Sequence, residues 1–292
     1  MKCLIIGSEG YIGSHLKYYI KSKGFELYCY DYIDLLEEKY SKIDILDYDS
    51  VKTIDFNVDL VFLIAGKTGT YDGFDNYEDY ININELGLLN VLNAIRISEF
   101  RPRLIFPSTR LVYKGSDYPL KESDEKYPKT IYAVNKLACE HYLNIYKENF
   151  KINYTIFRIC VPFGNIFSDD YSFGTIGFFI KQAKSGKNIN LYGNGSIKRT
   201  FTYINDLIFQ IVEASILSES KNEIYNIGGI TLSLKQAAEI VSLHFDKIKI
   251  NYIPWPKQDL IIESGSTFFD DTKLKKIIGK INYVNLKEIK IC

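Results

Sequence analysis

The chain has 292 residues, with 36 Lys and Arg against 36 Asp and Glu, so its formal net charge is zero. The length allows one large domain or two modest ones, and the 46% of hydrophobic residues is ordinary for a globular protein. The balanced charge argues against binding to nucleic acid or to an anionic membrane surface. No apolar run approaches the roughly 20 residues that cross a bilayer. No leader precedes the first apolar segment, so we expect neither membrane insertion nor secretion.

The number and spacing of the cysteines and histidines predict neither a set of disulfide bonds nor a metal site. The five cysteines are odd in number and widely scattered, and the three histidines show no metal-ligand spacing. Neither set fits a disulfide framework or a zinc site. We therefore expect reduced thiols, a cytoplasmic location and no bound metal.

The first half of the chain alternates short apolar runs with segments of helical periodicity. The patterns predict strands at 2–6, 26–30, 60–64, 104–107 and 154–159, and helices at 11–23, 82–98 and 131–150. Such alternation indicates βαβ units. We expect an α/β fold with a doubly wound parallel sheet of the Rossmann type, covered by helices on both faces.

The regular alternation ends after residue 162. A loop rich in Gly, Ser and Asp at 165–175 precedes predicted helices at 176–185 and 234–245. We expect residues 1–162 to form a dinucleotide-binding domain, to which 197–228 returns. Residues 163–196 and 229–292 are expected to form a smaller mixed α/β lobe that binds the substrate.

The first predicted strand leads directly into the segment Gly7-Ser8-Glu9-Gly10-Tyr11-Ile12-Gly13. Glycines permit a tight turn, close approach of a pyrophosphate to the backbone, and close packing of the next helix, whose positive end faces the phosphates. Asp31 ends the second strand about 20 residues further on, where a carboxylate binds ribose hydroxyls and repels a 2′-phosphate. The segment therefore predicts a bound dinucleotide rather than a plain connection, with NAD favoured and NADP as the alternative.

Tyr132 and Lys136 are four residues apart and therefore share one face of the helix predicted at 131–150. A free tyrosine, with a pKa of about 10, is a poor base at neutral pH, and a nearby ammonium lowers that pKa. Alone, the pair is compatible with chance, because the chain has 24 tyrosines. Thr109, at the end of a predicted strand where ligands bind, adds a hydroxyl, and the three residues together predict a catalytic set.

Together these residues resemble the extended short-chain dehydrogenase/reductase family, which contains UDP-galactose 4-epimerase and other nucleotide-sugar epimerases, dehydratases and reductases. The resemblance covers nearly the whole chain and includes a GxxGxxG turn, an SSxxVY-like segment ending at Tyr113, an RDFxxVxD-like segment starting at Arg199, and a YNxG strand at 225–228. It implies cofactor contacts from fourteen positions: Gly7, Gly10, Tyr11, Ile12, Gly13, Asp31, Asp44, Ile45, Ala65, Gly66, Lys67, Asn84, Tyr132 and Lys136.

The resemblance also assigns the chemistry. It implies that Thr109, Tyr132 and Lys136 are catalytic, and that the nucleotide-sugar substrate contacts Thr109, Arg110, Arg199 and Asp259. Sugar dehydratases carry Asp-Glu where this chain has Arg110-Leu111, so dehydration is not expected.

Hydride transfer at C4 of a nucleotide-linked hexose is the expected reaction, as in a 4-epimerase. A 4-ketoreductase acting on nucleotide-linked 4-keto-6-deoxy sugars is the alternative, and a dinucleotide-binding regulatory protein is the non-enzyme rival. The family also implies a homodimer formed through the helices at 82–98 and 131–150.

Overall fold

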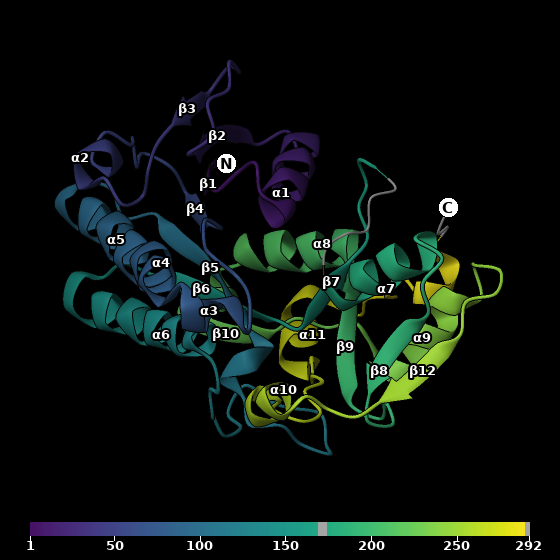
Figure 1. Cartoon of the computed structure of the whole chain (residues 1–292). Coiled ribbons are helices and arrows are strands. Elements are labelled where there is room, and N and C mark those ends of the chain that lie inside the picture. The colour runs from purple at the N-terminus through teal and green to yellow at the C-terminus, as the bar shows by residue number, and fades with distance from the viewer. Residues whose placement is uncertain (169–173, 290–292) are drawn as a thin grey trace.

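The computed structural model describes residues 1–168 and 174–289, and its centre is a seven-stranded sheet (Figure 1). The strand order is β10-β6-β5-β4-β1-β2-β3, and every pairing is parallel. The strands are β1 (Lys2–Ile6), β2 (Glu26–Asp31), β3 (Tyr40–Lys42), β4 (Leu60–Leu63), β5 (Arg103–Thr109), β6 (Tyr154–Ile159) and β10 (Glu223–Asn226). The order reverses between β1 and β4, which is where doubly wound sheets bind their ligands. The predicted Rossmann fold is confirmed.

Helices cover both faces of this sheet (Figure 1). One face packs against α1 (Tyr11–Ser22), α8 (Ile204–Ser215) and α11 (Thr272–Ile278) through a core that includes Leu16, Leu207 and Leu274. The other face packs against α2 (Tyr48–Val51), α5 (Gly87–Ile97) and α6 (Ile131–Phe150) through a core that includes Val51, Val91 and Leu143. The strands are apolar on both faces because neither face meets water.

A smaller lobe stands beside the carboxyl edge of the sheet (Figure 1). It contains a three-stranded sheet of β11 (Ile230–Ser233), β9 (Lys198–Tyr203) and β7 (Val161–Phe163), and a two-stranded sheet of β12 (Ile250–Ile253) and β8 (Ile189–Tyr192). Its helices are α7 (Gly174–Lys184), α9 (Leu234–Ser242) and α10 (Lys257–Ile262). Strand β9 pairs with β7 and β11, and the next element, α8, packs against the large sheet.

Several predicted elements match the structure closely, including β1, β6 and α6. The helix predicted at 82–98 is instead a π-helical turn, η1 (Asn82–Leu86), followed by α5. Strand β3 and the short helices α3 (Asp72–Asp75) and α4 (Tyr77–Ile81) had no clear sequence signal.

The described residues also form the short 3₁₀ turns η2 (Arg110–Val112), η3 (Ser218–Ser220) and η4 (Leu286–Glu288). Residues 169–173 of the predicted loop, and Cys292, lie outside the described residues. In the described part of the chain, no helix is both long enough and apolar enough to span a membrane.

Candidate active site

A groove of about 610 Å³ opens at the carboxyl ends of β1, β2 and β4, at the point where the strand order reverses. Of the predicted cofactor residues outside α6, all but Gly13 and Asn84 line this groove. The same walls include Glu9, Tyr32, Ile33 and Thr68, which were not among the predicted cofactor contacts. The groove therefore joins the glycine-rich turn, the end of β2 and the turn after β4 in one site.

The glycine-rich turn has the shape that a pyrophosphate site requires. Gly7 has φ +92°, and a Cβ there would lie 2.4 Å from the Ala65 amide nitrogen. A Cβ on Gly13 would lie 2.0 Å from the Gly7 carbonyl oxygen, so α1 packs directly on the turn. Helix α1 begins at Tyr11, and the residue before it, Gly10, forms no side-chain cap. The residues present fit a dinucleotide whose phosphates meet the positive end of α1.

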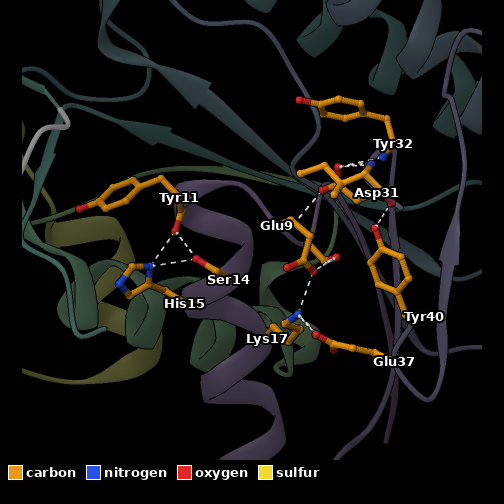
Figure 2. A network of polar contacts seen from close by, with 11 residues as sticks. Glu9, Tyr11, Ser14, His15, Lys17, Asp31, Tyr32, Glu37 and Tyr40 are labelled. Carbon is orange, nitrogen blue, oxygen red and sulfur yellow. Dashed lines mark hydrogen bonds and ion pairs between the residues drawn. The ribbon is translucent and has the colours of Figure 1, made fainter. Parts of the chain in front are cut away.

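Asp31 lies where the adenosine ribose of such a dinucleotide would be held (Figure 2). Its carboxylate is buried and accepts hydrogen bonds from the amides of Glu9 at 2.9 Å and Tyr32 at 2.8 Å. The Glu9 carboxylate pairs with Lys17 at 2.8 Å. Glu9 is thus a second carboxylate at this end of the groove, with its charge balanced by Lys17. The sequence feature that could have identified Glu9 as part of the groove is its position inside the glycine-rich turn.

The turn after β4 is held by Asn84 from the π-helical turn. The Asn84 Oδ1 atom accepts a hydrogen bond from the Lys67 amide at 2.9 Å, and its Nδ2 atom donates to the Lys67 carbonyl oxygen at 3.1 Å. Ala65 and Gly66 precede this clamp and line the groove. Asn84 therefore fixes the turn at the predicted nicotinamide end of the groove, although Asn84 itself does not line the groove.

Thr109, Tyr132 and Lys136 come together beside the groove. Thr109 ends β5, and its hydroxyl lies close enough to the Tyr132 phenol to lower the pKa of that phenol. Tyr132 and Lys136 are buried on the same face of α6, with exposed fractions of 9% and 4%. A methyl group on Gly66 would lie 3.7 Å from the Lys136 Nζ atom. Lys136 therefore stands next to the groove, with Tyr132 and Thr109 beyond it.

Burial shifts the pKa values of this pair in opposite directions. Burial raises the pKa of Tyr132 to about 12, although the hydrogen bond with Thr109 and the charge of Arg110 lower it. Burial lowers the pKa of Lys136 to about 8. Desolvation of the phenolate outweighs the lowering effects of Thr109 and Arg110, so the Tyr132 pKa lies above that of a free tyrosine.

The two predicted substrate-binding arginines lie in one cluster. Arg199, on β9, bonds to the Glu263 carboxylate at 2.7 Å and to the Gly265 carbonyl oxygen at 2.6 Å. Arg110, in η2, donates to the Thr267 hydroxyl at 3.0 Å. Glu263 and Thr267 come from a segment that carried no sequence motif.

Asp259 lies half-buried on α10, and its carbonyl oxygen accepts the Glu263 amide at 3.0 Å. Its carboxylate forms no ion pair with either arginine among the described residues.

A doubly wound parallel sheet with a glycine-rich groove, and with a hydroxyl, a phenol and an ammonium gathered beside it, is the arrangement of an NAD-dependent enzyme of the extended short-chain dehydrogenase/reductase type. Residues 3–228 match the model of the NAD dependent epimerase/dehydratase family, and the chain belongs to that family. NAD is accordingly its cofactor, as Asp31 had indicated.

Curated relatives are similar along most of their length. The chain is 28% identical over 257 residues to the UDP-glucuronate 4-epimerase of Thermodesulfobacterium geofontis, covering 86% of this chain and 76% of the relative. It is 27% identical to an uncharacterized UDP-glucose epimerase, YtcB, of Bacillus subtilis, covering 99% and 95%.

Among solved structures, the UDP-glucuronic acid 4-epimerase of Bacillus cereus, in complex with UDP-glucuronic acid and NAD, superposes with a TM-score of 0.85. That comparison covers 99% of this chain and 96% of that chain, at 24% identity. It supports the fold.

Proposed function

We propose that the protein is a nucleotide-sugar 4-epimerase acting on a UDP-linked hexose. The observation that carries the proposal is the meeting of Thr109, Tyr132 and Lys136 beside the dinucleotide groove. The UDP-sugar 4-epimerases among the similar proteins support the choice of reaction and of nucleotide. The absence of acids at Arg110 and Leu111 argues against dehydration.

Tyr132, Thr109 and Lys136 each have a distinct role in the proposed reaction. NAD, when bound, supplies the hydride acceptor for C4 of the sugar. The Tyr132 phenol oxygen exchanges the proton of the 4-hydroxyl group, and the Thr109 hydroxyl holds the same substrate oxygen. Lys136, beside Gly66, orients the nicotinamide ribose and adds positive charge near the phenol once the site is filled. If the 4-keto sugar rotates in the site before the hydride is returned, the hydride adds to the opposite face of C4. The configuration at C4 is then inverted.

Tyr132→Phe tests this proposal. Loss of the phenolic hydroxyl should reduce turnover of UDP-sugars by roughly 10²-fold to 10⁴-fold, the range for a general acid or base. NAD binding should remain, because the ring is kept. Tyr146→Phe is the matched control on the same helix, since the Tyr146 hydroxyl bonds to Asn93 at 3.0 Å, away from Thr109. It should retain wild-type turnover.

Two results would contradict the proposal. Unchanged activity of Tyr132→Phe would remove the catalytic assignment of Tyr132. Turnover that consumes one NADH or NADPH per sugar would exclude a 4-epimerase and indicate a 4-ketoreductase. Both are read from the same assays, run with and without added cofactor.

The proposal extends to the assembly and the compartment. A homodimer through α5 and α6 is supported by exposed apolar side chains on these helices, at Ile97, Val134 and Ile145. A cytoplasmic location is supported by the four described cysteines, which are buried and unpaired. The division of labour between a dinucleotide-binding domain and a substrate lobe, proposed from the sequence, is supported by the separate cores of the two parts.

A further inference from the structure

Arg110 occupies an unusual place in the site. It directly follows Thr109 and lies in η2, where the chain leaves the carboxyl end of β5. Its guanidinium is close enough to Tyr132 to lower the pKa of the phenol. It is half-buried, and its contact in the described structure is the neutral hydroxyl of Thr267 at 3.0 Å. A guanidinium thus stands next to the reacting end of the sugar without a carboxylate bonded to it.

The surrounding charges are unbalanced. Burial of the Arg110 guanidinium, together with the nearby charge of Arg199, lowers the pKa of Arg110 to about 10. Lys129 donates to the Glu263 carbonyl oxygen at 2.7 Å. Glu263 is the one carboxylate that forms an ion pair in this cluster within the described residues, and it bonds to Arg199. Two neighbouring guanidinium groups therefore share one bonded carboxylate, with the Lys129 ammonium on the backbone of the same residue, and an added anion would be stabilised.

The backbone holds this cluster in a fixed geometry. The segment that carries Glu263 and Thr267 lies against β9, where Thr267 pairs with Arg199, and against the chain that follows Arg110, where the Ser116 amide bonds to Ser266 at 2.8 Å. A Cβ on Gly115 would lie 1.8 Å from the Ser264 carbonyl oxygen, so the two segments are in direct contact. The guanidinium groups of Arg110 and Arg199 are thus positioned before any substrate binds, which favours bidentate binding of an anion.

A nucleotide sugar brings its diphosphate to such a site, and Arg199 is already proposed to bind that group. Arg110 directly follows Thr109, and its guanidinium acts on the Tyr132 phenol, so it lies on the side of the site where the oxygen at C4 would react. We propose that Arg110 is a specificity-determining residue that binds a carboxylate on the sugar ring, and that the substrates are nucleotide-linked uronic acids. This inference rests on the proposed function, which it narrows to one class of sugar.

Isothermal titration calorimetry of the full chain in saturating NAD tests the inference. It measures the affinity for three ligands: UDP, UDP-glucose and UDP-glucuronic acid. The wild-type protein should bind UDP-glucuronic acid roughly tenfold or more tightly than UDP-glucose, as expected for a charged hydrogen bond in a half-buried site. Arg110→Met should bring the two sugar affinities together, while the affinity for UDP changes by less than about twofold. Arg110→Lys keeps the charge and should retain part of the preference.

Arg199→Met is the matched control, because it should weaken UDP and both sugars alike. Unchanged NAD affinity in each variant shows that the groove remains folded. If Arg110→Met weakens UDP as much as UDP-glucuronic acid, Arg110 binds the diphosphate and the inference is wrong. Equal binding of both sugars by the wild type would also overturn it, while leaving the proposed function intact. Failure of all three ligands to bind would overturn both.

Discussion

A buried lysine and a buried tyrosine share one face of α6, and desolvation penalises the charged form of each. In the ligand-free protein, Tyr132 therefore holds its proton more firmly than a free tyrosine, and Lys136 holds its proton less firmly. Sequence spacing correctly placed the two groups together, but it could not weigh burial against charge. The pKa shift of a group depends on the whole environment that the fold builds around it.

The lowered pKa of Lys136 gives stability a specific pH dependence. In the unfolded chain this amine titrates at about 10.4, whereas burial lowers its pKa to about 8 in the folded protein. Between these two pKa values the unfolded state binds more protons than the folded state. The free-energy cost of burying the charged amine is therefore complete below the folded-state pKa, and it decreases as the pH rises toward the unfolded-state pKa. Lys136→Met removes the penalty.

Urea denaturation of dinucleotide-free protein at several pH values measures this effect. The stability of the wild type relative to Lys136→Met should increase as pH rises from about 7 to about 10. Since both proteins share every other titrating group, the difference isolates the amine. A difference that stays constant over this range would show that Lys136 is not desolvated.

At the scale of elements, the junction of β1, its glycine-rich turn and α1 depends on the absence of side chains. Gly13→Ala would place a Cβ 2.0 Å from the Gly7 carbonyl oxygen, a backbone atom that cannot move away without displacing the turn. We expect a loss of about 1–3 kcal/mol in the free energy of unfolding, typical of overpacking. NAD binding should weaken as well.

Gly10→Ala is the control for this substitution. Gly10 has an ordinary φ of −72°, and a Cβ there would lie 3.7 Å from the Gly7 carbonyl oxygen, at normal contact distance. Chemical denaturation of the dinucleotide-free variants should therefore show a small change for Gly10→Ala and a large one for Gly13→Ala. Equal changes would mean that backbone entropy, and not the close contact, limits residue 13.

The π-helical turn η1 shows where sequence periodicity reaches its limit. Apolar spacing predicted one continuous helix at 82–98, and α5 does follow, but the first turn is wider. The wider turn lets Asn84 bond to both the amide and the carbonyl of Lys67. Gly87, next along the chain, packs against Ile45, to which a Cβ would approach within 2.5 Å. These constraints come from neighbours far along the chain, which periodicity does not record.

For the molecule as a whole, the proposed dimer has a direct test. Ile97 and Ile145 expose 58% and 50% of their surface on the two helices that would meet a partner copy. Sedimentation velocity should find a dimer for the wild type and a monomer for Ile97→Glu/Ile145→Glu, because charges buried in an interface are costly.

Leu243→Glu, at a position 82% exposed at the end of α9 in the small lobe, should leave the dimer intact. A monomeric wild-type protein would count against the proposed interface.

The sequence by itself determined the parallel sheet, the dinucleotide turn, the acidic group at the end of β2 and the shared face of Tyr132 and Lys136. Each of these is encoded in a short stretch, as a periodicity, a glycine spacing or an i,i+4 pair. The end of a predicted strand added Thr109 and the family resemblance added Asn84, and the structure then supplied their positions beside the groove.

Only the tertiary structure decided the cluster around Arg110. This residue and its partner Thr267 are 157 positions apart, and Glu263 reaches Arg199 across 64 positions. Their meeting depends on how the small lobe packs against the carboxyl edge of the sheet, which no local pattern specifies. The charge balance at the sugar end of the site, and with it the proposed preference for an acidic sugar, therefore became visible only in the folded chain.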